Sequence, residues 1–158
     1  MYRTVLLAYD GSREGQLALR EGARLAQICG SKVVLLAVVE PSFDYTFAMD
    51  SGVGYLPPES QVDFEGILSE GAERLTRMGL VPITRLEKGA PADQIAAVAL
   101  EVAADLVVVG HQKQGLFARW LTGSVTATLS DSLNCSLLIG RTEVSDELLF
   151  ANAATPQG

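Results

Sequence analysis

The sequence has few of the residues that metal, redox and nucleic-acid sites require. It contains two cysteines, one histidine and one tryptophan among 158 residues. Because Cys29 and Cys135 each lie in an apolar pattern, neither a disulfide framework nor a metal cluster is indicated. Basic residues are also scarce, with 12 against 19 acidic residues and a formal net charge of −7. The chain therefore lacks the basic face that binds nucleic acid or an anionic membrane surface.

Long hydrophobic runs are missing as well, and no segment reaches the length of a membrane span. The first residues, from Met1 to Val5, enter an apolar segment directly and do not have the layout of a signal peptide. We therefore expect a cytoplasmic protein. Hydrophobic residues nevertheless make up 48% of the chain, which is long enough for one domain with a substantial core.

Short apolar runs alternate with helix-like segments along the chain. Runs that are rich in β-branched residues predict five strands, over residues 4–9, 32–39, 81–86, 106–109 and 136–139. Apolar residues at spacings of three and four predict helices between them, over about residues 13–29, 58–78, 91–102 and 124–133. Strands and helices in alternation indicate a parallel α/β sheet. The pattern alone leaves two strand orders open, 3-2-1-4-5 and 2-1-3-4-5.

The stretch from Leu106 to Ser124 carries the clearest functional signal. Its apolar strand ends at Gly110 and leads into a polar loop, which closes on Gly123 and Ser124 where a helix begins. Free N–H groups at a helix N-terminus attract anions, and glycines let the backbone approach a ligand and adopt positive φ. This arrangement predicts a phosphate-binding loop.

Gly110 and the Gly123-Ser124 pair resemble the glycine signature of the universal stress protein family, G-x2-G-x9-G-[ST], without insertion or deletion. The resemblance covers residues 1–141 and implies one domain there. It implies a single doubly wound five-stranded parallel sheet of order 3-2-1-4-5 with helices on both faces, a Rossmann-like fold similar to that of the adenine nucleotide α-hydrolases. Residues 142–158 form an acidic C-terminal extension, which either packs across a dimer interface or is disordered beyond Asn152.

The resemblance implies that the loop wraps the phosphates of ATP, with or without Mg²⁺. In the implied strand order, a crevice opens at the carboxyl ends of the first and fourth strands, where open α/β sheets bind their ligands. The expected nucleotide contacts come from strand ends, the loop and the start of the next helix: Ala8, Tyr9, Asp10, Val38, Val39, Gly110, His111, Lys113, Gly115, Gly123, Ser124, Val125 and Thr126.

Several of these residues have an expected role. The Asp10 carboxylate would accept hydrogen bonds from ribose hydroxyls or hold an ion near the phosphates, and the alternative is an Asx-type cap on the next turn. Ala8 and Tyr9 would form the floor under the sugar. Main-chain groups of Val38 and Val39 would bond the adenine edge, as the resemblance implies.

Lys113 stands where the family signature has its middle glycine, and Gly115 follows two positions later. If this position requires positive φ, a lysine strains the loop by about 1 kcal/mol, and its Cβ blocks the approach of phosphate. A lysine ammonium beside a triphosphate is, on the other hand, attractive. Two functions therefore remain open: an ATP-binding regulatory dimer of the stress response, and a dimer that binds no nucleotide and acts through protein contacts.

Little or no catalysis is expected. His111 has no recognisable nucleophile as a partner, and the loop lacks the Gly-Lys-Ser/Thr ending of a P-loop. The turn at residues 10–12 also lacks the Ser-Gly-Gly-Asp-Ser loop of a nucleotide α-hydrolase. Family members typically dimerise by antiparallel pairing of their last strands, which would be Ser136–Gly140 here. The client protein stays unidentified.

Overall fold

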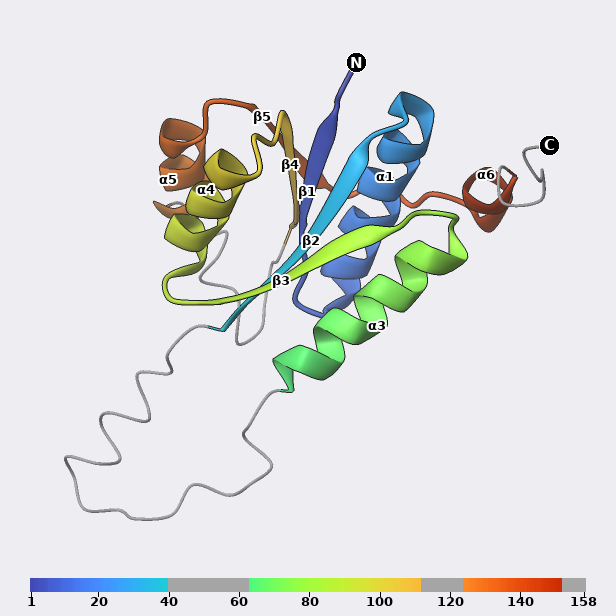
Figure 1. Cartoon of the computed structure of the whole chain (residues 1–158), viewed down its shortest axis with the longest axis horizontal. Helices are drawn as coiled ribbons and strands as arrows, with labels where there is room; N and C mark the ends of the chain where they lie inside the picture. Colours follow the sequence, from blue (N-terminus) through green and yellow to red (C-terminus); the bar gives the residue numbers. More distant parts are fainter. Residues whose placement is uncertain (40–62, 112–123, 152–158) are drawn as a thin grey trace, which may run out of the picture.

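A single parallel sheet runs through the part of the chain that the computed structural model describes, which is residues 1–39, 63–111 and 124–151, with the backbone alone for residues 124–127. Its strands are β1 (Thr4–Ala8), β2 (Lys32–Val39), β3 (Pro82–Lys88), β4 (Leu106–Gly110) and β5 (Ser136–Gly140). All neighbours are parallel, in the order β3-β2-β1-β4-β5 (Figure 1). The structure therefore confirms the α/β sheet and the strand order that the family resemblance implied.

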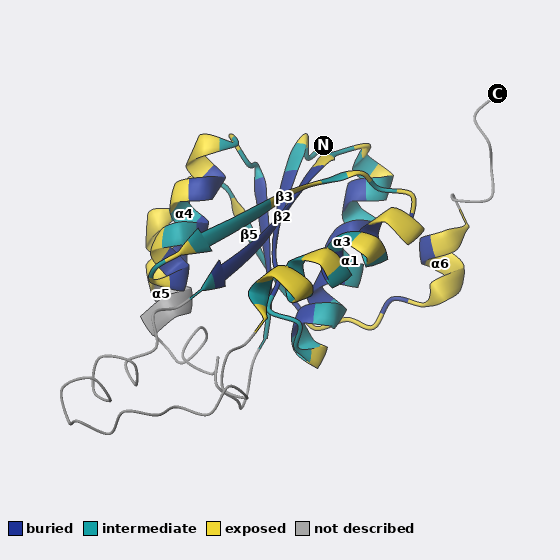
Figure 2. Ribbon diagram, turned by 60° about the horizontal axis from the view of Figure 1, so that its bottom comes forward, coloured by how far each residue is buried: buried dark blue, intermediate teal, exposed yellow. Residues whose placement is uncertain are grey.

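Helices cover both faces of this sheet, as Figures 1 and 2 show. One face carries α1 (Arg13–Cys29), α3 (Phe64–Arg77) and the short α6 (Asp146–Phe150). The other face carries α4 (Pro91–Glu101) and α5 (Ser124–Ser132). None of the helices described is both long and apolar enough to cross a membrane.

Each face of the sheet has its own core because side chains alternate along a strand. On β1, Leu7 belongs to the cluster beneath α1 and α3, whereas Leu6 belongs to the cluster beneath α4 and α5. A strand that is buried on both faces needs apolar residues at consecutive positions, which explains the continuous apolar runs of β1, β2 and β4. β3 lies at one edge of the sheet and is more exposed, and polar residues interrupt its apolar ones.

Both ends of α1 carry capping residues that the sequence shows. The Ser12 hydroxyl accepts a hydrogen bond from the Gly15 N–H at 2.9 Å and caps α1, and Gly30 ends that helix with a left-handed φ of 63°. The predicted start of the next helix near Pro58 lies outside the described residues. The helix that is described there begins at Phe64, with Asp63 as its N-cap.

The segment after β5 packs against α1 of its own chain. The Arg20 guanidinium donates a hydrogen bond to the Val144 carbonyl at 2.6 Å, and the Gln27 amide donates to the Leu149 carbonyl at 2.8 Å. Val144 and Leu149 are both buried. The sequence did not predict α6, which belongs to the extension 142–158. Residues after 151 lie outside the described part of the chain.

Candidate functional site

The carboxyl ends of β1 and β4 lie side by side at the centre of the sheet. β1 pairs with β2 on one side and with β4 on the other, so the winding of the chain reverses between β1 and β4. Ligands of open α/β sheets bind in the crevice that opens at such a reversal. The structure brings predicted residues of three adjacent strand ends to this edge: Ala8, Tyr9, Asp10, Val38, Val39, Gly110 and His111.

Asp10 caps the turn that leads from β1 into α1. Its Oδ1 atom accepts hydrogen bonds from the Ser12 backbone N–H at 2.9 Å and from the Ser12 hydroxyl at 2.6 Å. The same hydroxyl accepts from Gly15 and caps α1, so the two side chains hold the turn together. The structure therefore shows the Asx-type role of Asp10, while a contact with ribose stays a prediction.

Gly110 lies against the first turn of α1. A Cβ atom at Gly110 would lie 2.9 Å from the carbonyl carbon and oxygen of Glu14 and 2.9 Å from the Gly15 nitrogen. Backbone atoms of a helix do not move aside as a flexible side chain would, so a larger residue fits only at a cost in packing. Gly110 is not among the described glycines with positive φ. The close approach of α1 is what requires glycine here.

Tyr9 and Ala8 point to opposite faces of the sheet. Ala8 belongs to the core beneath α4 and α5, whereas the Tyr9 ring is buried beneath α3, where its hydroxyl donates a hydrogen bond to Glu70 Oε2 at 2.6 Å. Burial and this hydrogen bond raise the pKa of Tyr9 above its usual value. Glu70 also pairs with Arg74 on the same helix. The Tyr9 ring and the Ala8 side chain therefore lie on opposite faces of the sheet, and the floor under the sugar stays a prediction.

Within its described residues, the carboxyl end of β2 consists of Val38 and Val39 and offers main-chain groups. Val38 is buried in the core beneath α4 and α5, as a strand residue should be. The Val39 carbonyl accepts a hydrogen bond from the Gly89 N–H at 3.0 Å. Because a carbonyl oxygen can accept two hydrogen bonds, this geometry leaves room for the adenine contact, which stays a prediction.

The remaining predicted contacts belong to the loop and to α5. Lys113, Gly115 and Gly123 lie outside the described residues, and so do the side chains of Ser124, Val125 and Thr126. The backbone of α5 begins at Ser124, as predicted. Because α5 connects the end of β4 with the start of β5, its N-terminus lies at the same edge of the sheet as the strand ends. A helix N-terminus at that edge suits an anion.

Arg141 lies beside the predicted contact His111 at this edge, and the sequence analysis did not name it. Its guanidinium NH2 atom lies 3.1 Å from the His111 Nδ1 atom. Arg141 directly follows β5, whose last residue, Gly140, is the register partner of Gly110. Its position could have indicated it, because Arg141 directly follows β5, and β5 lies beside β4, the strand that ends at Gly110.

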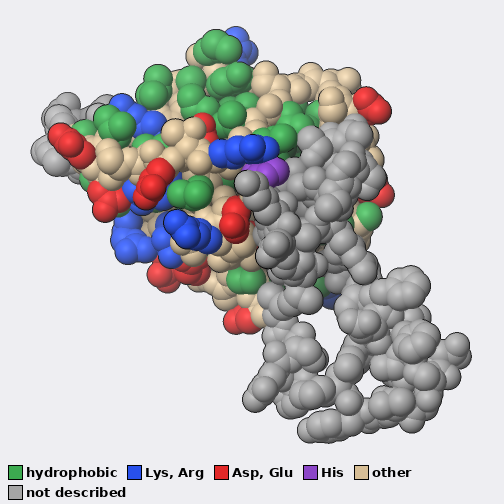
Figure 3. Space-filling view, turned by 180° about the vertical axis from the view of Figure 1, so that it is seen from behind, with side chains coloured by type: hydrophobic (Ala, Val, Ile, Leu, Met, Phe, Trp, Pro, Cys, Tyr) green, Lys and Arg blue, Asp and Glu red, His purple; other side chains and the backbone are tan. Residues whose placement is uncertain are grey.

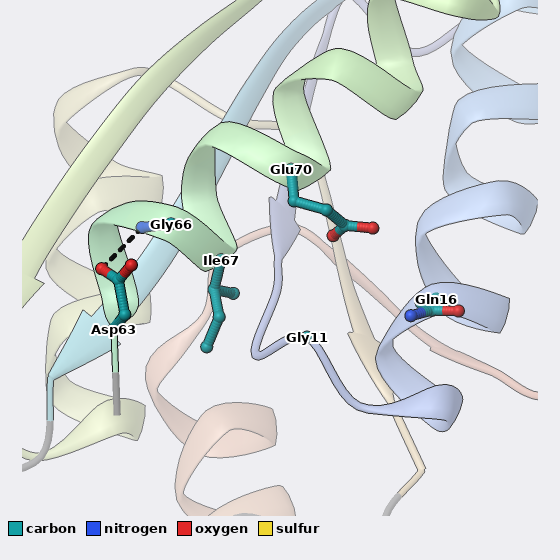
Figure 4. Close-up of a pocket in the computed structure, with 6 residues that line it drawn as sticks. All are labelled: Gly11, Gln16, Asp63, Gly66, Ile67 and Glu70. Atoms are coloured by element: carbon teal, nitrogen blue, oxygen red, sulfur yellow. Dashed lines mark hydrogen bonds between the residues drawn. The ribbon is translucent and has the colours of Figure 1, made fainter. Parts of the chain in front are cut away.

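A separate pocket of about 390 Å³ lies between α1 and α3, beside the turn that follows β1 (Figure 4). It is lined by Gly11, Gln16, Asp63, Gly66, Ile67 and Glu70. Figure 4 shows Glu70 of α3 and Gln16 of α1 pointing toward one another. None of the lining residues is a predicted nucleotide contact. No local sequence signal predicts that α1 and α3 lie beside each other here.

The described residues include no group of three or more histidine, cysteine or acidic side chains that could hold a metal ion. Cys29 and Cys135 are free thiols. Burial and the nearby charge of Asp105 raise the pKa of the Cys135 thiol, which disfavours the reactive thiolate.

Comparisons with known proteins agree with the fold. The profile of the universal stress protein family matches residues 1–141. A universal stress protein of Synechocystis sp. is 33% identical over 144 residues, which cover 88% of this chain and 85% of the relative. A solved universal stress protein in complex with cAMP is 27% identical, with a TM-score of 0.66 and coverage of 90% of this chain and 99% of that one. A protein of the same family from Burkholderia pseudomallei is 25% identical, with a TM-score of 0.62 over 87% of this chain and 95% of that one. The chain belongs to the universal stress protein family.

Proposed function

We propose that this chain binds an adenine nucleotide at the carboxyl edge of β1, β2 and β4, and that it acts as a homodimeric regulator in the stress response with little or no catalysis. ATP, with or without Mg²⁺, is the expected ligand. One observation carries the proposal. Predicted contact residues from the ends of three strands lie together at one edge of the sheet, where the winding of the chain reverses. A cytoplasmic location and a client protein that responds to the nucleotide are part of the same proposal.

A solved relative supports the choice of ligand. The universal stress protein whose structure contains cAMP is 27% identical and aligns over 90% of this chain. Its ligand is an adenine nucleotide, the class of molecule that the glycine signature predicts.

The described residues at this edge fit such a ligand in chemical terms. The N-terminus of α5 and the basic side chains of His111 and Arg141 suit phosphate oxygens. Main-chain groups at the end of β2 suit the adenine edge. Where Mg²⁺ accompanies ATP, Asp10 is the carboxylate at this edge that would hold it.

The two edges of the sheet differ in a way that supports dimerisation through β5. β3 contains Pro82, and its Arg85 guanidinium donates hydrogen bonds to Glu87 at 2.7 Å and to Glu101 of α4 at 2.8 Å. Proline and charged side chains discourage the pairing of an edge strand with another chain. β5 consists of Ser136–Gly140 and contains no charged residue. The edge that lacks such protection is therefore the one that a second copy would cover.

Isothermal titration calorimetry of ATP with Mg²⁺, and separately of cAMP, tests nucleotide binding. We expect micromolar affinity for ATP, about −8 kcal/mol. The substitution Gly123→Asp should abolish it, because a carboxylate in the loop repels phosphate.

Gly30→Asp is the matched control, because it also replaces a glycine with an aspartate. Gly30 lies at the C-terminal end of α1, whereas the proposed site lies near the N-terminal end of that helix, and a Cβ at Gly30 would have nothing within 4 Å. This variant should bind as the wild type does. Absence of heat from either nucleotide at millimolar concentration, with the wild-type protein folded, would refute nucleotide binding.

The second candidate function is a dimer that binds no nucleotide and acts through protein contacts. Lys113 at the middle glycine position of the signature favours it, and so does the use of Asp10 Oδ1 by Ser12. An absence of nucleotide binding together with a stable dimer in solution would select this function.

A further inference from the structure

Arg141 and His111 form a basic pair at the carboxyl edge of the sheet. The Arg141 NH2 atom lies 3.1 Å from the His111 Nδ1 atom. Each residue directly follows a strand end, and these ends, Gly140 and Gly110, are partners in the β4–β5 register. Figure 3 shows the histidine beside a basic side chain on the molecular surface. The pair therefore stands where the predicted phosphate loop begins.

The backbone of Arg141 is fixed to α1. Glu21 Oε2 accepts hydrogen bonds from the backbone N–H groups of Arg141 and Thr142, both at 3.1 Å. Gly140 allows this approach, because a Cβ there would lie 2.7 Å from the Cβ of Ala18. Within residues 1–39, 63–111 and 124–151, the Arg141 guanidinium forms no ion pair. Its backbone is thus held in place, and no described carboxylate neutralises its charge.

The chemistry of the two side chains sets the direction of the contact between Arg141 and His111. A guanidinium has donors only, so Nδ1 of His111 is the acceptor in this contact. This bond uses one of the five N–H groups of the guanidinium. The others can bind phosphate oxygens in the paired geometry that arginine favours.

The strand order sets the distance from Arg141 to the expected adenine contacts. Those contacts are proposed at the end of β2, and β5 is separated from β2 by β1 and β4. Three strand spacings amount to about 14 Å. At this distance from the base, the part of an extended nucleotide that meets Arg141 is its polyphosphate end.

We propose that Arg141 binds the terminal phosphates of a nucleoside triphosphate, and that His111 is a positioning residue that orients the Arg141 guanidinium. The inference rests on the proposed nucleotide-binding function and adds a preference for triphosphate over monophosphate. Arg141 lies outside the glycine loop, so its contribution is separable from that of the loop.

The test is calorimetry of ATP and of AMP with the wild type, Arg141→Gln and the control Arg77→Gln, which removes the same charge from an exposed arginine in the last turn of α3. We expect Arg141→Gln to weaken ATP binding about tenfold and to leave AMP binding unchanged, because one charge-assisted contact is lost. Arg77→Gln should change neither affinity. Circular dichroism should show all three proteins equally folded, because Glu21 bonds the backbone of Arg141 and not its side chain.

His111 is tested by two substitutions. His111→Leu removes the acceptor and should lower the ratio of ATP to AMP affinity, whereas His111→Asn keeps an acceptor near the Nδ1 position and should restore it. The role of Arg141 would be overturned, with nucleotide binding left intact, by either of two results. One is a ratio of ATP to AMP affinity that is unchanged in Arg141→Gln, including an equal loss for both nucleotides; the other is a wild type that does not prefer ATP over AMP. A wild type that binds neither nucleotide would overturn the proposed function, and the role of Arg141 with it.

Discussion

Gly110 is constrained by the first turn of α1 and not by its own backbone angles. We predict that Gly110→Ala lowers the free energy of unfolding by about 2–3 kcal/mol in the absence of nucleotide, because the new methyl group meets helix backbone that cannot rotate away. Urea denaturation of the nucleotide-free protein measures this loss.

Gly30→Ala is the comparison, since Gly30 has a φ of 63° but open space around it. Its loss should be about 1 kcal/mol, from the left-handed conformation alone. If Gly110→Ala were as stable as the wild type and failed only to bind nucleotide, the glycine would serve the ligand and not the packing of α1.

Asp105 joins the start of β4 to the start of β1. Its carboxylate accepts hydrogen bonds from the Arg3 N–H at 2.8 Å and from the Thr4 N–H at 3.0 Å. These backbone donors hold the pKa of Asp105 below its usual value. Because the folded pKa is the lower one, the carboxylate contributes its full stability above the unfolded pKa, and this contribution is lost as the pH falls toward the folded pKa.

We therefore predict that Asp105→Asn is less stable than the wild type by about 1–2 kcal/mol at neutral pH. The difference should shrink as the pH falls below the usual aspartate pKa of about 3.9. Urea midpoints across this range, with Asp131→Asn on the exposed surface of α5 as the control, provide the measurement. Parallel pH profiles for the wild type and Asp105→Asn would show that the carboxylate charge does not act in this way.

Among the elements, α6 depends on a few contacts with α1. The Gln27 amide of α1 donates hydrogen bonds to the Leu149 carbonyl of α6 at 2.8 Å and to the carbonyl of Met78, the residue that follows α3, at 2.7 Å. Leu149 is fully buried, whereas its neighbour Leu148 is 50% exposed. One residue of this pair therefore anchors the helix, and the other faces solvent.

We predict that Leu149→Ala destabilises the docking of α6 by about 2 kcal/mol, near the lower limit for a buried leucine because a terminal helix can detach locally. Leu148→Ala should change stability by less than about 0.5 kcal/mol. Hydrogen exchange of the α6 amides reports the difference, with faster exchange in Leu149→Ala only. Equal acceleration in both variants would mean that α6 is not anchored through Leu149.

The elements that could be predicted from the sequence are those with local signals. Ser12 and Gly30 mark the ends of α1 within a few residues of its apolar pattern, and the continuous apolar run of β4 reveals a strand buried on both faces. α6 depends on a bond between residues 122 positions apart, and the Arg141–His111 pair on residues 30 positions apart. No local pattern encodes such contacts. The strand order, likewise, came from the family resemblance and not from the pattern.

For the molecule as a whole, the strand order gives β5 two proposed roles. Its carboxyl end leads into Arg141 beside the proposed nucleotide site, and its outer edge is the one without protective charges. Ile83 of β3 is also an exposed apolar edge residue, at 59% exposure, but it is followed by the charged group of Arg85, Glu87 and Glu101. Substituting a lysine into each edge strand in turn therefore tests which edge pairs with a second copy of the chain.

We predict that the wild type sediments as a dimer and that Leu137→Lys in β5 converts it to a monomer, because the ammonium groups of two copies would repel each other across the paired strands. Ile83→Lys in β3 is the matched control and should leave the dimer intact. Sedimentation equilibrium measures the mass, and circular dichroism checks that Leu137→Lys, which alters a half-buried residue, keeps its secondary structure. A monomeric wild type, or a dimer that Ile83→Lys dissociates and Leu137→Lys does not, would exclude β5 as the interface.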